Sequence, residues 1–296
     1  MSTRPIRGLS RRQALAAAVA TPCLMQPAAV LAWPFNGEVR YPADGRFRVS
    51  DAGPEAWSDL PAYDFVVADS QVSYGEPSVA PVGVGALFGV FGALAGAAVA
   101  NVASRKSGGV YESRLKLKFH GEVAALLAAR LNGAHRMAGP GEEATIEVLP
   151  SIRFEAETPQ TPRLQTRLDV KFRGLPRGRP EVKVYRHILE TVRPMDTWVA
   201  DDAQSLRAAV RTSFEALVDV IVDDLRGRFD EAFTPEVAPV THWKEPGSPD
   251  VSYGVLLRDT PTRVLLAMQR NQSADPTKLR LIDRAFYQPV PAPKAG

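Results

Sequence analysis

In the stretch Leu164-Gln165-Thr166-Arg167-Leu168-Asp169-Val170-Lys171-Phe172, every second side chain is apolar apart from Thr166, and the side chains between them are polar or charged. Because successive side chains of a β-strand point to opposite faces of a sheet, this period of two predicts a strand with one buried face. Glycine and proline follow at 174–178, and apolar side chains resume at 182–189. Together these residues predict an antiparallel hairpin.

Further strands are expected on both sides of this hairpin. Pro150 interrupts the alternation in 144–156, which therefore predicts a bent or two-part strand. The other runs with strand-like patterns are 115–119, 251–257, 263–268 and 279–287.

One long amphipathic helix should accompany the strands. Its apolar side chains recur every three or four residues, which places them on one helix face. They are Leu206, Val210, Phe214, Leu217, Ile221 and Leu225. Asp201 or Asp202 is expected to be the N-cap. A shorter helix is predicted at 122–131, followed by a left-handed Gly133.

Runs of strands with helices laid on one side predict an α+β fold. We expect an antiparallel sheet with the long amphipathic helix packed on one face, plus a separate Gly/Ala-rich hydrophobic helix or hairpin. The predicted segments are a cleavable signal peptide at 1–32, a proline-rich and loosely structured segment at 33–80, a hydrophobic membrane-contact segment at 81–106, an α+β domain at 107–234, and a linker with C-terminal strands packed on that domain at 235–296.

The first residues have the composition of an export signal. Residues 1–12 carry four arginines and no acid, and 13–24 are uncharged and rich in alanine. Arg11 and Arg12 lie in a stretch, SRRQAL, that resembles the twin-arginine translocation motif. Alanine follows where that motif prefers phenylalanine, so the general secretory route is an alternative. Small residues before Trp33 predict cleavage after Ala32. The competing interpretation is a short basic segment followed by an amphipathic first helix.

Removal of residues 1–32 would change the chemistry of the chain. Cys23 is the only cysteine, and Pro22 before it argues against a lipid anchor, so the mature chain would contain no thiol. The remaining 32 basic and 33 acidic side chains nearly cancel. This balance gives no indication of nucleic-acid binding.

Residues 82–103 form an uncharged run of 22 residues, long enough for a helix to cross a bilayer. Glycine pairs four residues apart share a helix face and allow another backbone to approach closely. The segment resembles the glycine-zipper segments of envelope proteins. Its predicted membrane-contact residues are Gly85, Gly89, Gly92, Gly96, Phe88 and Phe91.

The topology of 82–103 stays open between three alternatives. Arg105 and Lys106 directly after it favour a cytoplasmic end for a spanning helix. That orientation conflicts with export of the larger C-terminal part. The alternatives are a hairpin or peripheral insertion with both ends in the periplasm, a true inner-membrane span, and a helix buried in protein.

No arrangement of residues in the sequence indicates catalysis, a cofactor or a metal. His120, His135, His187 and His242 are scattered, and each is predicted to face solvent or make a single hydrogen bond. No Gly-x-Ser-x-Gly motif is present, and the glycine-rich segment lacks the ending of a phosphate loop. The acids of the long helix are expected to form a solvated outer face: Glu215, Asp219, Asp223 and Asp224.

These features favour an exported, membrane-associated envelope protein in the periplasm, without evident catalysis, that binds a protein or lipid partner. The glycine pairs would also allow a homo-oligomer. One alternative is an accessory subunit in lipid or transport handling with an apolar ligand site. Another is a periplasmic hydrolase whose catalytic residues are scattered in the sequence. Residues 110–230 loosely resemble proteobacterial exported proteins of uncharacterised function.

The export interpretation makes a direct prediction. Mass spectrometry of the protein purified from the envelope should find a mature N-terminus at Trp33, because signal peptidase requires small residues before the cleaved bond. An intact Met1, or a lipid on Cys23, would contradict it.

Overall fold

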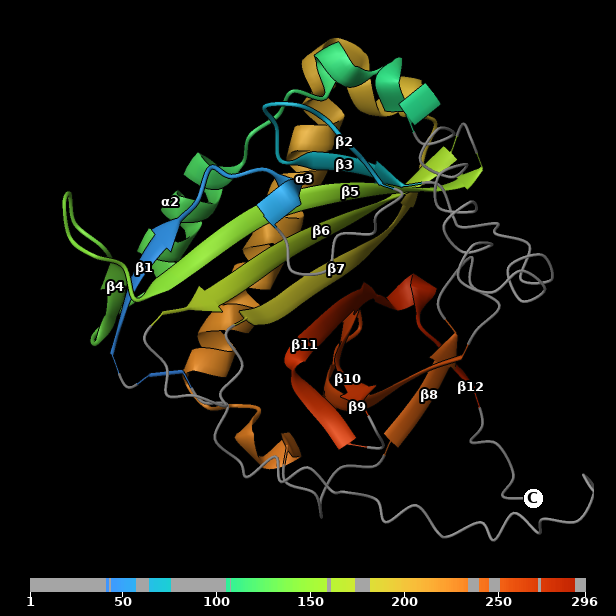
Figure 1. Ribbon diagram of the computed structural model, residues 1–296. Coiled ribbons are helices and arrows are strands. Elements are labelled where there is room, and N and C mark those ends of the chain that lie inside the picture. Colours follow the sequence, from blue (N-terminus) through green and yellow to red (C-terminus); the bar gives the residue numbers. More distant parts are fainter. Residues whose placement is uncertain are drawn as a thin grey trace, which may run out of the picture. The chain divides into compact units, whose positions relative to one another are not determined.

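In the residues that it describes, the computed structural model has a large mixed sheet and two labelled α-helices, an α+β arrangement (Figure 1). The structure describes residues 41–42, 44–56, 64–75, 105–106, 108–158, 161–173, 182–233, 240–244, 251–270 and 273–290. The predicted signal residues Arg11 and Arg12, the cleavage site at Ala32 and Trp33, and the whole of 82–103 lie outside these ranges.

Within the described ranges the strand order is β12-β8-β9-β10-β11-β7-β6-β5-β1-β4, with β3 also paired to β5 and β2 to β3. The strands are β1 Gly45–Val49, β2 Phe65–Val66, β3 Val72–Gly75, β4 His135–Met137, β5 Ile146–Thr158, β6 Thr161–Phe172, β7 Val182–Val192, β8 Val240–Lys244, β9 Val251–Asp259, β10 Arg263–Arg270, β11 Ser273–Asp283 and β12 Gln288–Val290. The helices are α2 His120–Arg130 and α3 Met195–Leu225, and the short 3₁₀ turns are η1 Pro54–Ala56, η2 Glu112–Arg114, η3 Asp230–Phe233 and η4 Arg284–Phe286.

The prediction of a purely antiparallel sheet is wrong. The β6–β7 hairpin is antiparallel as expected, but β11 pairs parallel with β7, and β1 and β3 pair parallel with β5. Side-chain alternation reports which face of a strand is buried. It carries no information on the direction of the neighbouring strand, because that depends on the connection between the two.

Pro150 does not divide its strand, because β5 continues through it. On the edge away from β6, β5 pairs with β1 up to Val148 and with β3 from Ile152. The Val148 carbonyl and the Ile152 N–H both bond across this edge. The nitrogen of Pro150 faces the same edge between the two partner strands, where no donor is needed.

The alternation at 115–119 is real, but the predicted strand is wrong. Leu115, Leu117 and Phe119 are buried, yet the segment pairs with no strand of the described chain. The N–H groups of Leu115 and Leu117 bond within local turns. Gln71 supplies two more partners, because its backbone N–H donates to the Leu117 carbonyl and its side-chain oxygen accepts from the Phe119 N–H. The same alternation of buried and exposed side chains therefore occurs in an irregular segment, whose ends at Leu115 and Phe119 are not extended (ψ of 7° and 0°).

α3 consists of two helical parts separated by a non-helical break at 200–203, and the predicted helix corresponds to the part after the break. Its apolar side chains are buried from Leu206 to Ile221, as the spacing indicated. Asp201 and Asp202 are not N-caps, because they lie inside a non-helical break with φ of 50° and 56°. Left-handed backbone at consecutive residues other than glycine is sterically unfavourable, so local preference did not predict this break.

No helix in the described ranges has the length and apolarity needed to cross a membrane.

Phe214 lies at the centre of the main core, fully buried and 5.7 Å from the ring of Phe119. Phe214→Ala should lower the free energy of unfolding by about 3–5 kcal/mol, since it removes a buried ring and leaves a cavity. Urea denaturation measures this change. Tyr253→Ala, at a ring that is 43 % exposed, should change stability far less. Equal losses in the two variants would contradict the assigned core.

Candidate functional site

The strand registers place four polar side chains in a row on one face of the sheet. Thr166 of β6 is paired directly with His187 of β7, and directly paired residues point to the same face. His187 is aligned with Leu281 of β11, so Asp283, two residues on, shares its face. Arg263 of β10 is paired with Asp283. The row therefore runs across four adjacent strands.

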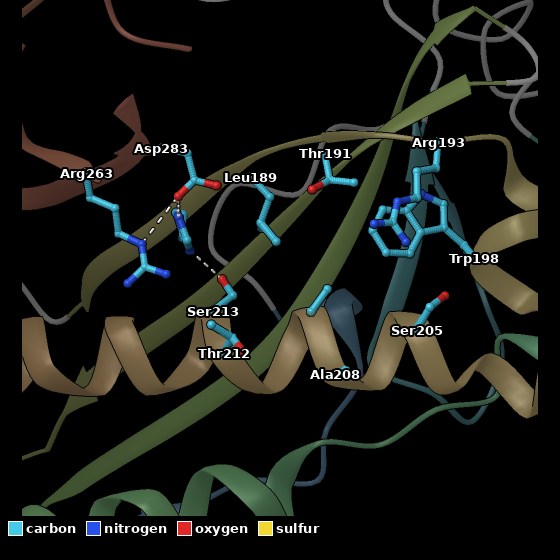
Figure 2. Close-up of a pocket in the computed structure, with 12 residues that line it drawn as sticks. Leu189, Thr191, Arg193, Trp198, Ser205, Ala208, Thr212, Ser213, Arg263 and Asp283 are labelled. Atoms are coloured by element: carbon cyan, nitrogen blue, oxygen red, sulfur yellow. Dashed lines mark hydrogen bonds and ion pairs between the residues drawn. The ribbon is translucent and has the colours of Figure 1, made fainter. Parts of the chain in front are cut away.

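Ser213 of α3 completes a chain of hydrogen bonds with this row (Figure 2). Its Oγ lies 2.6 Å from Nδ1 of His187 and is also bonded to Oγ1 of Thr166. On the other side of the ring, Nε2 of His187 lies 2.9 Å from Oδ1 of Asp283. We call Thr166, Ser213, His187, Asp283 and Arg263 the polar relay.

Asp283 is held in its ionised form. Its Oδ2 accepts the backbone N–H of Glu190 at 3.0 Å, and its Oδ1 accepts Nε–H of Arg263 at 3.3 Å. Burial alone raises the pKa of this carboxyl, but the bonds from His187 and Glu190 and the charge of Arg263 outweigh burial, so its pKa lies below the usual range. The relay therefore contains a stable negative charge.

The prediction that His187 faces solvent or makes one hydrogen bond is wrong. Its side chain is 1 % exposed and both ring nitrogens are bonded. Burial lowers the pKa of His187, although the bond to Asp283 opposes the shift. The ring is thus neutral near pH 7. A carboxylate can only accept, so Nε2 carries the proton and Nδ1 accepts from Ser213.

The polar relay borders one end of a groove of about 440 Å³ between α3 and β7. Alternate residues of β7 line one side, and the residues of α3 that face them line the other (Figure 2). The lining residues are His187, Leu189, Thr191, Arg193, Trp198, Ser205, Ala208, Ala209, Thr212, Ser213, Arg263 and Asp283. β11 pairs with β7 only as far as Ile188, and on this edge no described strand continues beside the last residues of β7, whereas β6 pairs with them on the other edge. The groove lies where the β11–β7 pairing stops.

The other end of the groove holds two hydrogen-bond donors. The guanidinium carbon of Arg193 lies 5.2 Å from the centre of the Trp198 ring. The Trp198 side chain is fully buried, and its Nε1–H has no acceptor among the described residues. A buried donor without an acceptor is costly, so this end is suited to an oxygen atom supplied by a ligand.

A second buried polar cluster lies away from the groove. Asp224 of α3 bonds to Lys183 at 2.5 Å and to the hydroxyl of Tyr185, which is bonded to Tyr41. Burial raises the pKa of both tyrosines, so their hydroxyls stay protonated. The groove includes none of these residues. We interpret the cluster as a structural link between α3 and β7.

The predicted solvated acidic face of α3 is therefore only partly correct. Asp219 is exposed and pairs with Arg130 at 2.6 Å, and Glu215 pairs with Arg211. Asp223 and Asp224 are buried, because Arg258 and Lys183 bond to them. No group of three or more His, Cys, Asp or Glu side chains in the described ranges could hold a metal ion.

The other histidines lie apart from the relay. Nε2 of His135 lies 2.9 Å from the Pro42 carbonyl, and the ring of His242 packs edge-on against Tyr253.

The sequence did not predict the polar relay, because its members lie up to 117 positions apart, from Thr166 to Asp283. The strand registers alone bring them together. The one available signal was Thr166 on the apolar face of the strongest predicted strand.

Comparison of the chain with protein-family models, curated proteins and solved structures gave no match.

The buried neutral His187 predicts a pH-dependent stability. Its folded pKa is below the unfolded value of about 6.5, so the unfolded chain gains a proton first as the pH falls. Stability should fall from about pH 6.5 downward, by at most about 1.4 kcal/mol per pH unit until the folded pKa is reached. Asp283 has a lowered pKa, so its protonation changes the stability only at more acidic pH.

Urea denaturation from about pH 5 to 7.5 tests this, with His187→Gln expected to flatten the pH dependence. His135→Gln serves as the control, because its ring makes one bond at a half-buried site. An unchanged slope in His187→Gln would show that His187 is not the titrating group.

Proposed function

We propose that the groove between α3 and β7 binds a small organic anion with an apolar body. The observation that carries this proposal is the pair of donors at one end, Arg193 and Trp198. No carboxylate of the described chain pairs with Arg193, and the Trp198 N–H lacks an acceptor. A carboxylate or phosphate group of a ligand would accept from both.

The rest of the groove suits the apolar body of such a ligand. Leu189, Ala208 and Ala209 supply carbon surface beside the hydroxyls of Thr191 and Thr212. His187 lies on β7 and Arg193 directly follows its last residue, six positions on, which corresponds to about 20 Å at the rise of an extended strand. A volume of about 440 Å³ is within the range of small-molecule sites. An elongated ligand of modest size is therefore favoured over a bulky one.

This proposal corresponds to the alternative from the sequence in which the protein handles lipid or transport with an apolar ligand site.

We further infer that α3 covers one face of β5–β7. That inference is supported by its contacts with β6 and β7 and by the bonds of Ser213 and Asp224 to those strands. The signal-like residues 1–32 support export to the envelope, and 82–103 supports contact with membrane lipid. Together these proposals describe an envelope protein that takes up an anionic amphiphile near a membrane.

Calorimetric titration with octanoate tests the groove. The protein should bind octanoate, and Arg193→Gln should weaken binding about tenfold or more, since a hydrogen bond to a charged group contributes about 1.5–3 kcal/mol. Arg211→Gln is the matched control, because Arg211 is an exposed arginine of α3 outside the groove. Octanol, which has no charge, should bind more weakly than octanoate.

Trp198→Phe keeps an aromatic ring under Arg193 but removes the N–H donor together with part of the buried indole, so it tests the second donor separately from Arg193. We expect weaker octanoate binding, with circular dichroism checking that the variant is folded, because a smaller ring also lowers stability. Absence of octanoate binding, or equal losses in Arg193→Gln and Arg211→Gln, would overturn the proposal.

A further inference from the structure

The polar relay has the arrangement of a nucleophile, a base and a group that orients the base. Ser213 Oγ lies 2.6 Å from His187 Nδ1, and His187 Nε2 lies 2.9 Å from Asp283. Both distances are within the range expected for an activated serine. We propose that Ser213 is a nucleophile that accepts an acyl group from carboxylic esters bound in the groove.

The protonation states along the relay support this direction of proton transfer. The neutral His187 ring presents a lone pair at Nδ1 to the Ser213 hydroxyl. Asp283 is ionised and accepts from Nε2, so it stabilises the positive ring that forms when Nδ1 takes a proton. Asp283 acts as a positioning residue, itself fixed by the backbone of Glu190 and by Arg263.

Arg263 also supplies positive charge beside the nucleophile. Its Nε bonds to Asp283, and its terminal nitrogens point toward α3 on the side of Ser213 (Figure 2). The backbone N–H groups near Ser213 are engaged in α3, so they are not free to stabilise an oxyanion. The guanidinium of Arg263 lines the groove at this end, and we assign it the role of stabilising the negative oxygen that forms on the ester carbonyl.

The reaction balances with water as the second reactant. Ser213 Oγ attacks the ester carbonyl carbon while its proton moves to His187 Nδ1. The carbon–oxygen bond to the alcohol breaks, and the departing alcohol takes the proton from Nδ1. Water then gives a proton to Nδ1 and its oxygen attacks the acyl carbon. The acid is released, and Ser213 regains its proton from His187.

Access to Ser213 limits the rate. The residue borders the groove but is only 1 % exposed, because Thr166, His187 and the groove wall surround it. An ester carbonyl reaches Oγ only when the side chains that cover it on the groove side move aside while Ser213 stays bonded to His187. We therefore expect slow acylation, with the acyl-enzyme detectable by mass. The proposal rests on the proposed ligand groove.

Two probes test the nucleophile: a fluorophosphonate, which labels activated serines, and p-nitrophenyl acetate, whose hydrolysis releases a coloured phenolate. Peptide mass spectrometry should place the phosphonate on Ser213. Ser213→Ala and His187→Gln should each reduce the labelling rate and ester hydrolysis about 100-fold or more. Ser151→Ala is the matched control, because Ser151 is a fully buried serine on β5 outside the groove. It should react like the parent protein.

Circular dichroism and octanoate titration of the same variants separate the two proposals. Ser213→Ala and His187→Gln that stay folded and bind octanoate, yet react as fast as the parent protein, overturn the nucleophile and leave the groove standing. Loss of octanoate binding in the parent protein itself overturns the groove. If Ser213→Ala unfolds, the labelled position in the parent protein decides: a label on any other residue overturns the proposal.

Discussion

The parallel pairing of β11 with β7 is the constraint on which the candidate site depends. It joins β8–β12 to the β5–β7 part of the sheet, and its register aligns His187 with Leu281. Asp283 is thereby placed beside the His187 ring, on the face that α3 contacts through Ser213. The β11–β7 pairing ends at Ile188, and the residues of β7 after it line the groove. A register shift of one residue would turn Asp283 to the opposite face.

Burial explains why the polar groups between α3 and the sheet are bonded so completely. A polar group removed from water costs free energy unless it finds a partner. Ser213 and Asp224 of α3 each bond to two side chains of β6 or β7. Trp198 is the exception at the groove, with a buried donor and no acceptor in the described chain. Because the other polar groups have hydrogen-bond partners and the Trp198 N–H has none, the Trp198 end of the groove is where we place the charged group of a ligand.

Much of the secondary structure followed from local patterns, because burial of one face imposes a period on the sequence. The alternation in Leu164–Phe172 predicted β6, and the apolar spacing from Leu206 to Ile221 predicted the buried side of α3. The same reasoning predicted a strand at 115–119, where local turns and two hydrogen bonds with the buried Gln71 take the place of a neighbouring strand. It also missed the kink at Asp201, which local propensity disfavours.

The sequence by itself determined the α+β class, the β6–β7 hairpin and the buried side of the long helix, because each shows in the side-chain pattern of a continuous stretch of the chain. Only the tertiary structure decided the parallel pairings, the burial of His187 and the assembly of its relay with Ser213 and Asp283. These depend on which distant strands meet and in what register. That choice is made by the packing of the whole sheet, and no local pattern of side chains encodes it.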